Sequence, residues 1–407
     1  MSKQVSKKNK PTVVAVGLFI PGNSFTRVFA SLFEWLSGDY DIHWLGIAYK
    51  GPVTKKENYT LHPCNVNGGD IYGAYGAAAL AAELHANTLW LLNDFYLLKN
   101  YAQAWLPLKQ KGIRLLAYVP LDGCITHVSI VQDCFFLDDL VLYNQWALDE
   151  VQQAIAQFKQ QRPGEEFTVP RLHYRYHGVD RKTFYPSAEK KQEGLLKEKL
   201  FKMNDAAESI FILNANRYNE RKDIETTIEA FAKALPHFTK PACLCLHTPN
   251  LEPYIKEKLL AVIESSGAAK KILLNPLGDE YIDDAQLVNL YRACATGINT
   301  SLGEGWGMIS FEHAACGAAQ IVPGHTAPAE VWDKAAVVIN KDKPVTLSTN
   351  PFQMYAVSRD ELAAQLVKLV NDETFLADVS ERCYRHVAGN QFRWDAIAAQ
   401  WKELLTN

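Results

Sequence analysis

The sequence predicts an α/β protein made of two Rossmann-like domains, and two observations lead to this fold class. Short apolar strands alternate with amphipathic helices along most of the chain, which is the pattern of parallel sheets joined by right-handed crossovers. The chain also has 407 residues, about twice the usual size of a single domain. We therefore expect two similar halves that face each other across a cleft.

The first half begins with a buried strand at residues 11–20, a turn at Pro21-Gly22-Asn23 and a helix at residues 25–38. The strand is rich in β-branched residues, and the helix repeats its apolar residues at helical spacing. We expect this N-terminal domain to span residues 1–185. The same alternation continues through predicted strands at 41–49, 87–94, 114–121 and 138–145 and predicted helices at 77–86, 99–112 and 147–161.

The second half repeats the alternation after a charged stretch at residues 188–205, which predicts an exposed helix and a linker. We expect this C-terminal domain to span residues 186–385. Ligands of open parallel sheets bind at the carboxyl ends of the strands, so the cleft between the halves is the expected site. The predicted strands lie at 209–217, 242–248, 270–277 and 297–301, and the predicted helices at 223–235, 251–267 and 285–294.

The composition is that of an ordinary globular protein. Hydrophobic residues make up 48% of the chain and charged residues 21%, with a net charge of −3. This balance argues against a nucleic-acid binder. The Lys-rich start at residues 1–10 predicts a solvated leader with at most weak, peripheral membrane contact, and no segment has the length and apolarity of a signal peptide or a membrane span. We expect a cytoplasmic protein whose eight cysteines are free, buried thiols.

The segment Ser301–Trp332 carries the strongest functional signal. It places Glu304 and Glu312 eight positions apart, separated by a turn that contains Gly305 and Gly307, before an alanine-rich helix. Glycines allow a ligand to approach the backbone, and a helix N-terminus favours negative charge. Read separately, Glu304 is a loop charge and Glu312 a complement to the helix dipole. Read together with Gly305, Gly307 and Cys316-Gly317, the two carboxylates predict a functional site, in which the glycine turn and the helix N-terminus would bind an anionic group.

A polar turn at residues 216–223 supplies the matching cations. Arg217 and Lys222 follow a predicted strand and precede a helix, where they would project from the carboxyl edge of the sheet. Two cations together with helix-end amides would bind a diphosphate. The alternative is a solvated turn in which Arg221 and Lys222 lie on the surface.

Two positions in the first half also follow strand ends. At Gly22 and Asn23 a phosphate or a sugar could approach the backbone, although a plain tight turn explains these residues equally well. Asp122 could hydrogen-bond a sugar hydroxyl or an acceptor, or it could belong to an Asp-Gly turn. His127 and His177 are expected to be structural.

No metal site is predicted, because no two aspartates stand one residue apart at a strand end. The adjacent pairs Asp138-Asp139 and Asp283-Asp284 are expected to be exposed or to cap helices.

Taken together, these segments resemble the retaining glycosyltransferases of the GT-B fold, specifically glycosyltransferase family 4. Residues 303–319, GEGWGMISFEHAACGAA, match that family's two glutamates with seven residues between them. Residues 216–223, NRYNERKD, match its Arg and Lys with four residues between them. Residues 391–405 resemble its closing helix, so we expect residues 386–407 to pack back on the N-terminal domain.

The resemblance implies a role for each matching residue. Glu304 would contact hydroxyls of a donor sugar, Glu312 would hold the ribose, and Arg217 and Lys222 would bind the donor diphosphate. Many family members have a histidine where this chain has Asp122, and His177 replaces a usual asparagine. The expected catalytic residues are Asp122, Glu304, Arg217 and Lys222. The expected donor-binding residues are Gly22, Asn23, Arg217, Lys222, Glu304, Gly305, Trp306, Gly307, Met308, Ile309 and Glu312.

The implied function is the transfer of a sugar from a nucleoside-diphosphate sugar to a hydroxyl acceptor, with retention of configuration and without a metal or other cofactor. The acceptor would be a glycan, a lipid-linked molecule or a small molecule. Two alternatives stay open at this point: a non-catalytic relative that binds a sugar nucleotide or a glycan, and a nucleotide-sugar epimerase. The base, the sugar, the acceptor and the oligomeric state are left open.

Overall fold

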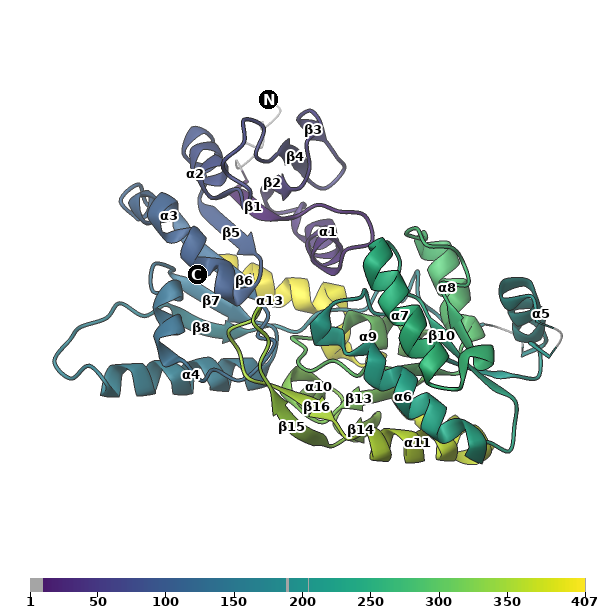
Figure 1. Ribbon diagram of the computed structural model, residues 1–407. Helices are drawn as coiled ribbons and strands as arrows, with labels where there is room; N and C mark the ends of the chain where they lie inside the picture. The colour runs from purple at the N-terminus through teal and green to yellow at the C-terminus, as the bar shows by residue number, and fades with distance from the viewer. Residues whose placement is uncertain (1–9, 188–189, 204, 407) are drawn as a thin grey trace, which may run out of the picture.

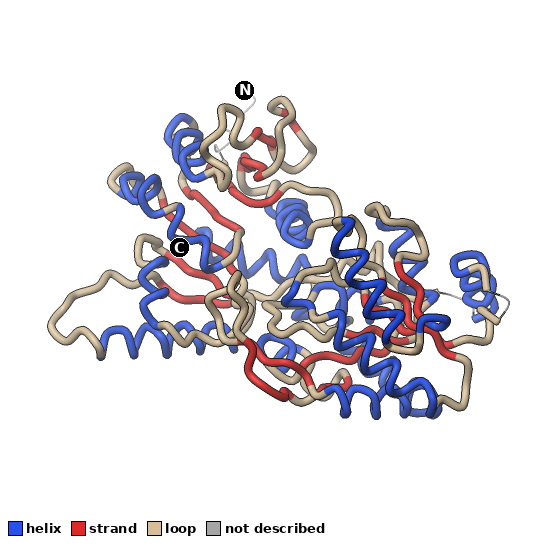
Figure 2. Tube along the Cα trace, viewed as in Figure 1, coloured by secondary structure: helices blue, strands red, loops and turns tan. Residues whose placement is uncertain are grey.

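A computed structural model describes residues 10–187, 190–203 and 205–406. Of the predicted Lys-rich leader, only Lys10 lies within the described residues. Two separate sheets occupy the two halves of the molecule, and helices cover both faces of each (Figures 1 and 2). The predicted α/β fold class is confirmed.

The first half contains an eight-stranded sheet with the strand order β3-β4-β2-β1-β5-β6-β7-β8. Neighbouring strands pair in parallel, except for the antiparallel pair β3 and β4 at one edge. The strands are β1 (Thr12–Leu18), β2 (Asp41–Ile47), β3 (Thr54–Lys55), β4 (Thr60–Pro63), β5 (Thr88–Leu92), β6 (Arg114–Val119), β7 (Asp139–Leu142) and β8 (Arg171–Tyr174).

The second half contains a parallel six-stranded sheet with the order β11-β10-β9-β12-β13-β14. A separate antiparallel pair, β15 and β16, follows it. The strands are β9 (Ile210–Asn214), β10 (Ala242–Leu246), β11 (Ile272–Leu274), β12 (Thr296–Ile298), β13 (Ala319–Pro323), β14 (Val337–Ile339), β15 (Lys341–Val345) and β16 (Met354–Val357).

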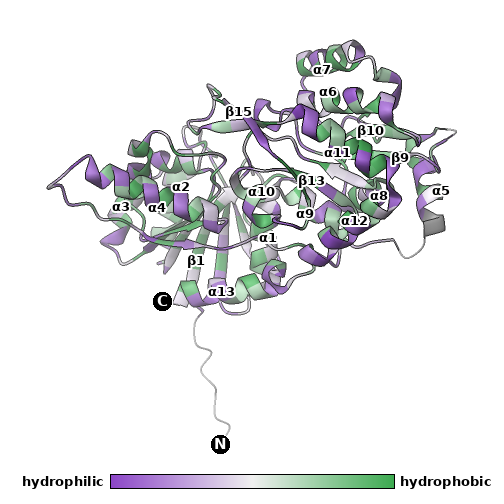
Figure 3. Ribbon diagram, turned by 90° about the horizontal axis from the view of Figure 1, so that it is seen from below, coloured by the Kyte–Doolittle hydropathy of each residue, from purple (hydrophilic) through white to green (hydrophobic). Residues whose placement is uncertain are grey.

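The helices bury one face against the sheets and leave the other to water, which Figure 3 shows as mixed hydrophobic and hydrophilic colouring along them. The first half and the linker contain α1 (Ser24–Leu36), α2 (Ala74–Glu83), α3 (Ala102–Lys109), α4 (Gln145–Gln160) and α5 (Lys190–Phe201). The second half contains α6 (Ile224–Ala234), α7 (Pro253–Ser265), α8 (Asp284–Ala293), α9 (Met308–Ala315), α10 (Thr326–Val331), α11 (Arg359–Asn371), α12 (Glu373–Val387) and α13 (Trp394–Thr406).

The last helix, α13, returns to the first half, where it lies beside α1 (yellow in Figure 1). Its Trp401 packs on Trp90 of β5, with ring centroids 4.3 Å apart. Arg114 of β6 also donates a hydrogen bond of 2.6 Å to the carbonyl of Leu404. The contacts join the chain end to the first sheet.

The halves also meet directly near the carboxyl ends of their strands. Cys124 and Gln353 exchange two backbone hydrogen bonds of 2.9 Å. Gly303 lies so close to Asp122 that a Cβ atom added to the glycine would stand 1.8 Å from the Asp122 carbonyl oxygen. Because any side chain at this position would collide with the opposite half, the contact requires glycine.

Local chemistry explains several element boundaries. Asn23 caps the N-terminus of α1, because its side chain accepts a 2.8 Å hydrogen bond from the Phe25 N–H. Asp283 forms a capping box with Gln286 at the start of α8, so its predicted capping role is confirmed. The prediction for Asp139 is wrong. Its carboxylate is fully buried and pairs with Arg114, Arg171 and His173, whose hydrogen bonds and charges outweigh the effect of burial and lower its pKa.

The eight cysteines are free, and seven of them are buried, with Cys124 partly exposed. Within the described ranges, no helix is long and apolar enough to cross a bilayer.

Candidate active site

A cavity of about 390 Å³ lies between the two halves, where the carboxyl ends of both sheets converge. The first half contributes the turn after β1, the ends of β5, β6 and β7, and helix α1. The second half contributes the loops after β9, β10 and β12 and the start of α9. Every residue that the sequence predicts for the site lies in this wall: Gly22, Asn23, Asp122, Arg217, Lys222, Glu304, Gly305, Trp306, Gly307, Met308, Ile309 and Glu312.

The loop after β9 is held in place by its own polar side chains. Asn219 caps a short 3-10 turn at Glu220–Lys222 by accepting a 3.1 Å hydrogen bond from the Lys222 N–H. The Thr300 hydroxyl reaches the carbonyls of Lys222 and Asp223 at 3.2 and 2.8 Å. These bonds fix the backbone at Lys222 before any ligand binds.

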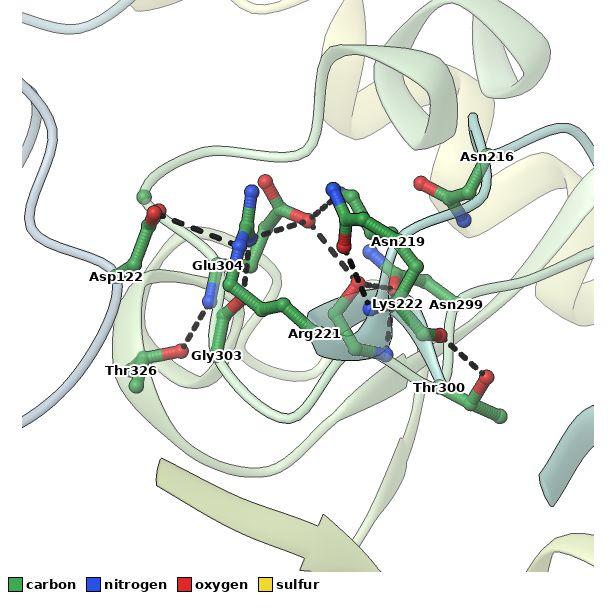
Figure 4. Close-up of polar contacts among 12 residues, drawn as sticks. Asp122, Asn216, Asn219, Arg221, Lys222, Asn299, Thr300, Gly303, Glu304 and Thr326 are labelled. Carbon is green, nitrogen blue, oxygen red and sulfur yellow. Dashed lines mark hydrogen bonds and ion pairs between the residues drawn. The ribbon is translucent and has the colours of Figure 1, made fainter. Parts of the chain in front are cut away.

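Glu304 is the centre of a compact charge cluster (Figure 4). Its Oε2 atom contacts Lys222 Nζ directly and lies 3.6 Å from Arg221 Nη1. The Ser301 hydroxyl donates a 3.2 Å hydrogen bond to the same oxygen. Burial alone would raise the pKa of Glu304, but the charges of Lys222 and Arg221 outweigh it and bring the pKa to about 2. Glu304 is therefore an anion at neutral pH.

Arg221, which the surface alternative places in solvent, lies inside the site. Its guanidinium donates to the Gly303 carbonyl and stands 3.5 Å from Asp122, which belongs to the opposite half (Figure 4). Burial would lower its pKa, yet Asp122 and Glu304 raise it above the ordinary value. The surface alternative is therefore wrong for Arg221 and Lys222. The sequence did contain a signal for Arg221, because Arg221 directly precedes Lys222 in the same short turn.

Arg217 differs from its neighbours because its charge is uncompensated. Its guanidinium lies over the Tyr281 ring, 5.8 Å from the centroid. No carboxylate of the described residues stands within ion-pair distance of it. It is a cation in the cavity wall that is available to an anionic ligand.

Two acidic side chains face this cluster from the first half. Burial raises the pKa of Asp122. The positive charge of Arg221 opposes this rise, and the negative charge of Glu304 adds to it. Asp94, just after β5, was not predicted, although its place after a strand end was a usable signal. Burial and the charge of Asp122 raise its pKa to about 7, and Tyr96 donates a 3.3 Å hydrogen bond to it.

Glu312 occupies a second acidic position, on α9, and is bridged to the first half. Arg27 of α1 places its Nε atom 3.3 Å from Glu312 and an Nη atom 2.7 Å from Asp284. The Tyr291 hydroxyl stands 3.4 Å from Glu312. Burial raises the pKa of Glu312 despite the opposing charge of Arg27. Neither Arg27 nor Asp284 was predicted, because their partners are more than 250 positions away in sequence.

The glycine turn gives α9 an open N-terminus. Gly307 adopts the left-handed region at φ 88°, and no side chain caps the helix. The first N–H groups of a helix have no partner within it, so they can bind an anion. Among the described residues, no group of three or more His, Cys, Asp or Glu side chains is arranged to hold a metal ion.

Comparisons with known proteins support the architecture. A sucrose-phosphate synthase from Thermosynechococcus elongatus aligns over 98% of each chain with a TM-score of 0.71 and 12% identity. An α,α-trehalose-phosphate synthase (UDP-forming) from Burkholderia vietnamiensis aligns over 98% of this chain and 99% of its own, with a TM-score of 0.72 and 12% identity. The chain has the GT-B fold. Anabaena HepE, solved with UDP and glucose, aligns over 97% of this chain and 99% of its own, with a TM-score of 0.70 and 13% identity.

Similarity in sequence is more limited. No family model matches the chain. The serotype-specific mannosyltransferase WbdA of Escherichia coli is 30% identical over 127 residues, which are 31% of this chain and 15% of that protein. The match thus spans less than a fifth of the curated relative. Membership of glycosyltransferase family 4 stays a prediction.

Proposed function

We propose that this protein is a retaining glycosyltransferase that transfers a hexose-type sugar from a nucleoside-diphosphate sugar to a hydroxyl acceptor. The observation that carries the proposal is a buried cluster of Lys222, Arg221 and Glu304 at the cleft. The exposed Arg217 lines the same cavity with a charge that is unpaired among the described residues. The similarity to a mannosyltransferase and the fold shared with a protein solved with UDP and glucose support it. We further propose membership of glycosyltransferase family 4.

In this proposal the donor lies along the loops of the second half. Its diphosphate binds Arg217, Lys222 and the N–H groups that open α9 after Gly307, and its sugar hydroxyls bind Glu304. Because Lys222 already contacts Glu304, it would lie between the carboxylate and the phosphate and hold both. Glu312 would accept hydrogen bonds from the ribose, as the family resemblance implies.

The reaction breaks the bond between the anomeric carbon and the leaving phosphate oxygen, which keeps the electron pair. The acceptor oxygen forms the new bond on the same face of the sugar, and its proton passes to the departing phosphate. Negative charge thus develops on the diphosphate, where fixed cations and backbone N–H groups stabilise it without a metal. Asp122 and Asp94 face this position from the first half, where they would orient the acceptor hydroxyl.

The proposal is tested by incubating the protein with a panel of nucleotide sugars and measuring nucleoside-diphosphate release, with and without sugar acceptors. Turnover that survives a metal chelator, with a product of retained anomeric configuration by NMR, is expected. An inverted product would exclude the front-face mechanism. Binding without transfer or hydrolysis would favour the non-catalytic alternative, and conversion of the donor to an epimer would favour the epimerase.

We also propose that the protein acts in the cytoplasm with at most peripheral membrane contact, as its composition suggests. Cell fractionation tests this, since recovery in a detergent-only fraction would contradict it.

A further inference from the structure

Three polar atoms of the cavity wall are buried without a hydrogen-bond partner among the described residues: His247 Nδ1, Trp306 Nε1 and the Tyr143 hydroxyl. Trp306 stacks on the Phe311 ring, and Tyr143 packs on the Tyr118 ring. His247 is therefore the candidate for a ligand contact. His247 directly follows β10, is 4% exposed and lines the cavity. Its Nδ1 atom is buried without a hydrogen-bond partner among the described residues. Leaving such a group unsatisfied costs stability, so a buried exception in a cavity wall points to a ligand.

Two other buried histidines have partners for a ring nitrogen, whereas His325, which does not line the cavity, also has a buried Nε2 atom without one among the described residues. His177 also lines the cavity, but its Nδ1 atom lies 2.8 Å from the Tyr118 hydroxyl. His313 places its Nε2 atom 3.1 and 2.9 Å from two backbone carbonyls. Burial lowers the pKa of His247 to about 4, so at neutral pH it is an uncharged ring that can donate or accept a hydrogen bond.

The strand order fixes which part of a donor His247 would meet. In the sheet order β11-β10-β9-β12, the Glu304 loop follows β12, the Arg217 and Lys222 loop follows β9, and His247 follows β10. A donor with its sugar at Glu304 and its diphosphate at the cations would therefore extend its nucleoside toward β10. The backbone N–H of His247 donates a 2.9 Å hydrogen bond to the carbonyl of Asn214 in β9.

The surroundings of His247 suit a flat ring. Pro249, Tyr281, Ile282 and Leu287 supply apolar surfaces in the same cavity. The loops after β10 and β11 are joined rigidly, because Asn275 bonds both the N–H and the carbonyl of Thr248 at 2.7 and 3.0 Å. Apolar walls with one buried polar group at a fixed position are typical of a site that reads the edge of a ligand.

We propose that His247 hydrogen-bonds the nucleobase of the donor and sets which base the protein accepts. The inference rests on the proposed function, since it needs a nucleoside-diphosphate donor in this cleft. It assigns the base contact to a residue that no motif of the sequence singled out.

The test measures affinities for UDP, GDP, ADP, CDP and TDP and for inorganic pyrophosphate by calorimetry. The wild type is compared with His247→Leu, with His247→Asn, which keeps a polar group near the Nδ1 position, and with Thr248→Val. Thr248 is a matched control, because its hydroxyl is also buried without a partner but does not line the cavity.

His247→Leu is expected to weaken the preferred nucleotide about 10-fold or more, the others less, and pyrophosphate by less than about twofold. His247→Asn should recover most of the loss, and Thr248→Val should bind like the wild type. Pyrophosphate binding also reports that the variants are folded. If the wild type and His247→Leu bind every nucleotide with equal affinity, the inference is overturned but the proposed function is not. An equal loss of affinity for all five nucleotides would also overturn the inference, because it would indicate a ribose contact. Failure of the wild type to bind any nucleotide would overturn the proposed function as well.

Discussion

At the scale of single residues, two cations of one loop have different surroundings. Lys222 is already paired with Glu304, whereas Arg217 has no carboxylate partner among the described residues. If both bind the departing diphosphate, Arg217→Ala and Lys222→Ala should each lower turnover about 100-fold or more, as loss of one transition-state donor does elsewhere. Initial rates at saturating donor measure this.

A surface lysine provides the control for that experiment. Among the described residues, the Lys256 ammonium of α7 pairs with Asp279 at the surface, outside the cavity wall, so Lys256→Ala should leave turnover unchanged. Near-normal turnover in both cleft variants would refute the diphosphate assignment. Lys222→Ala should also raise the pKa of Glu304 by removing the adjacent charge. A pH profile of turnover separates this change in Glu304 from the loss of the diphosphate contact.

The raised pKa of Asp94 makes a prediction about stability. Its pKa is about 7 in the folded protein and near 3.8 in an unfolded chain, so between these values the folded state retains a proton that the unfolded state loses. The stability contributed by Asp94 therefore falls as the pH rises from about 4 to about 7 and is constant above. Asp94→Asn should raise the thermal midpoint at pH 8 and have little effect near pH 4.

Thermal unfolding at both pH values checks this trend. Asp342→Asn, at an exposed carboxylate of β15, is the matched control and should shift the midpoint equally at both. A midpoint for Asp94→Asn below that of the wild type at pH 8 would show that the charged form of Asp94 is stabilised by its surroundings.

At the scale of elements, the loop between β12 and α9 is shaped by the opposite half. A Cβ atom at Gly303 would stand 1.8 Å from the Asp122 carbonyl oxygen. Gly303→Ala should push the halves apart at Glu304, destabilise the protein by about 1–3 kcal/mol and lower activity. Gly38→Ala should be neutral, because a Cβ there meets nothing within 4 Å. Equal midpoints and rates for the two variants would contradict the close contact.

Elements with a strong periodic pattern were predictable from the sequence. The strands β1, β5, β6, β9 and β10 are continuous apolar runs, and helices α1, α4 and α6 repeat apolar residues at helical spacing, so their predictions are confirmed. The helix after the glycine turn was also predicted. In the structure this helix, α9, ends just before Cys316 and Gly317, and Gly317 adopts the left-handed region at φ 95°. A glycine at that position is a reliable stop signal.

The C-terminal region was less predictable. No element was predicted between residues 333 and 390, which contain β14, β15, β16, α11 and α12. The exposed strand β15, with the sequence Lys-Asp-Lys-Pro-Val, has neither an apolar run nor alternation, and it forms because it pairs with β16. Pairing between strands is a tertiary property, so local pattern does not show it.

Within the site, sequence found the residues that stand near each other in the chain but missed their long-range partners. Glu304, Glu312, Arg217 and Lys222 carry local spacing that pointed to the cleft. Arg27 was missed because its ion pairs with Asp284 and Glu312 exist only once α1 meets the second half. His247 was missed because its significance lies in a missing hydrogen bond, which only coordinates reveal.

At the scale of the whole molecule, Arg27 links the two halves across the cleft. It belongs to α1, yet it pairs with Asp284 and with the buried Glu312 of the second half. Arg27→Ala should open the ligand-free protein, because it leaves Glu312 buried without a cation. A larger radius of gyration by small-angle X-ray scattering is expected, with a return toward the wild-type value when a nucleoside diphosphate binds.

The control for this opening is Lys182→Ala. Lys182 also pairs with α1, through Glu34, but both side chains are largely exposed, and such pairs contribute little. A radius of gyration for Arg27→Ala that matches those of the wild type and Lys182→Ala would show that other contacts, such as those of Cys124 with Gln353, hold the halves together.

A crystal structure of the protein with an intact nucleotide sugar tests the central claim most directly. We predict that phosphate oxygens lie within about 3 Å of Arg217, Lys222 and the backbone N–H groups following Gly307, with a sugar hydroxyl at Glu304. A donor bound elsewhere, or one whose diphosphate contacts neither cation, would contradict the proposed mechanism.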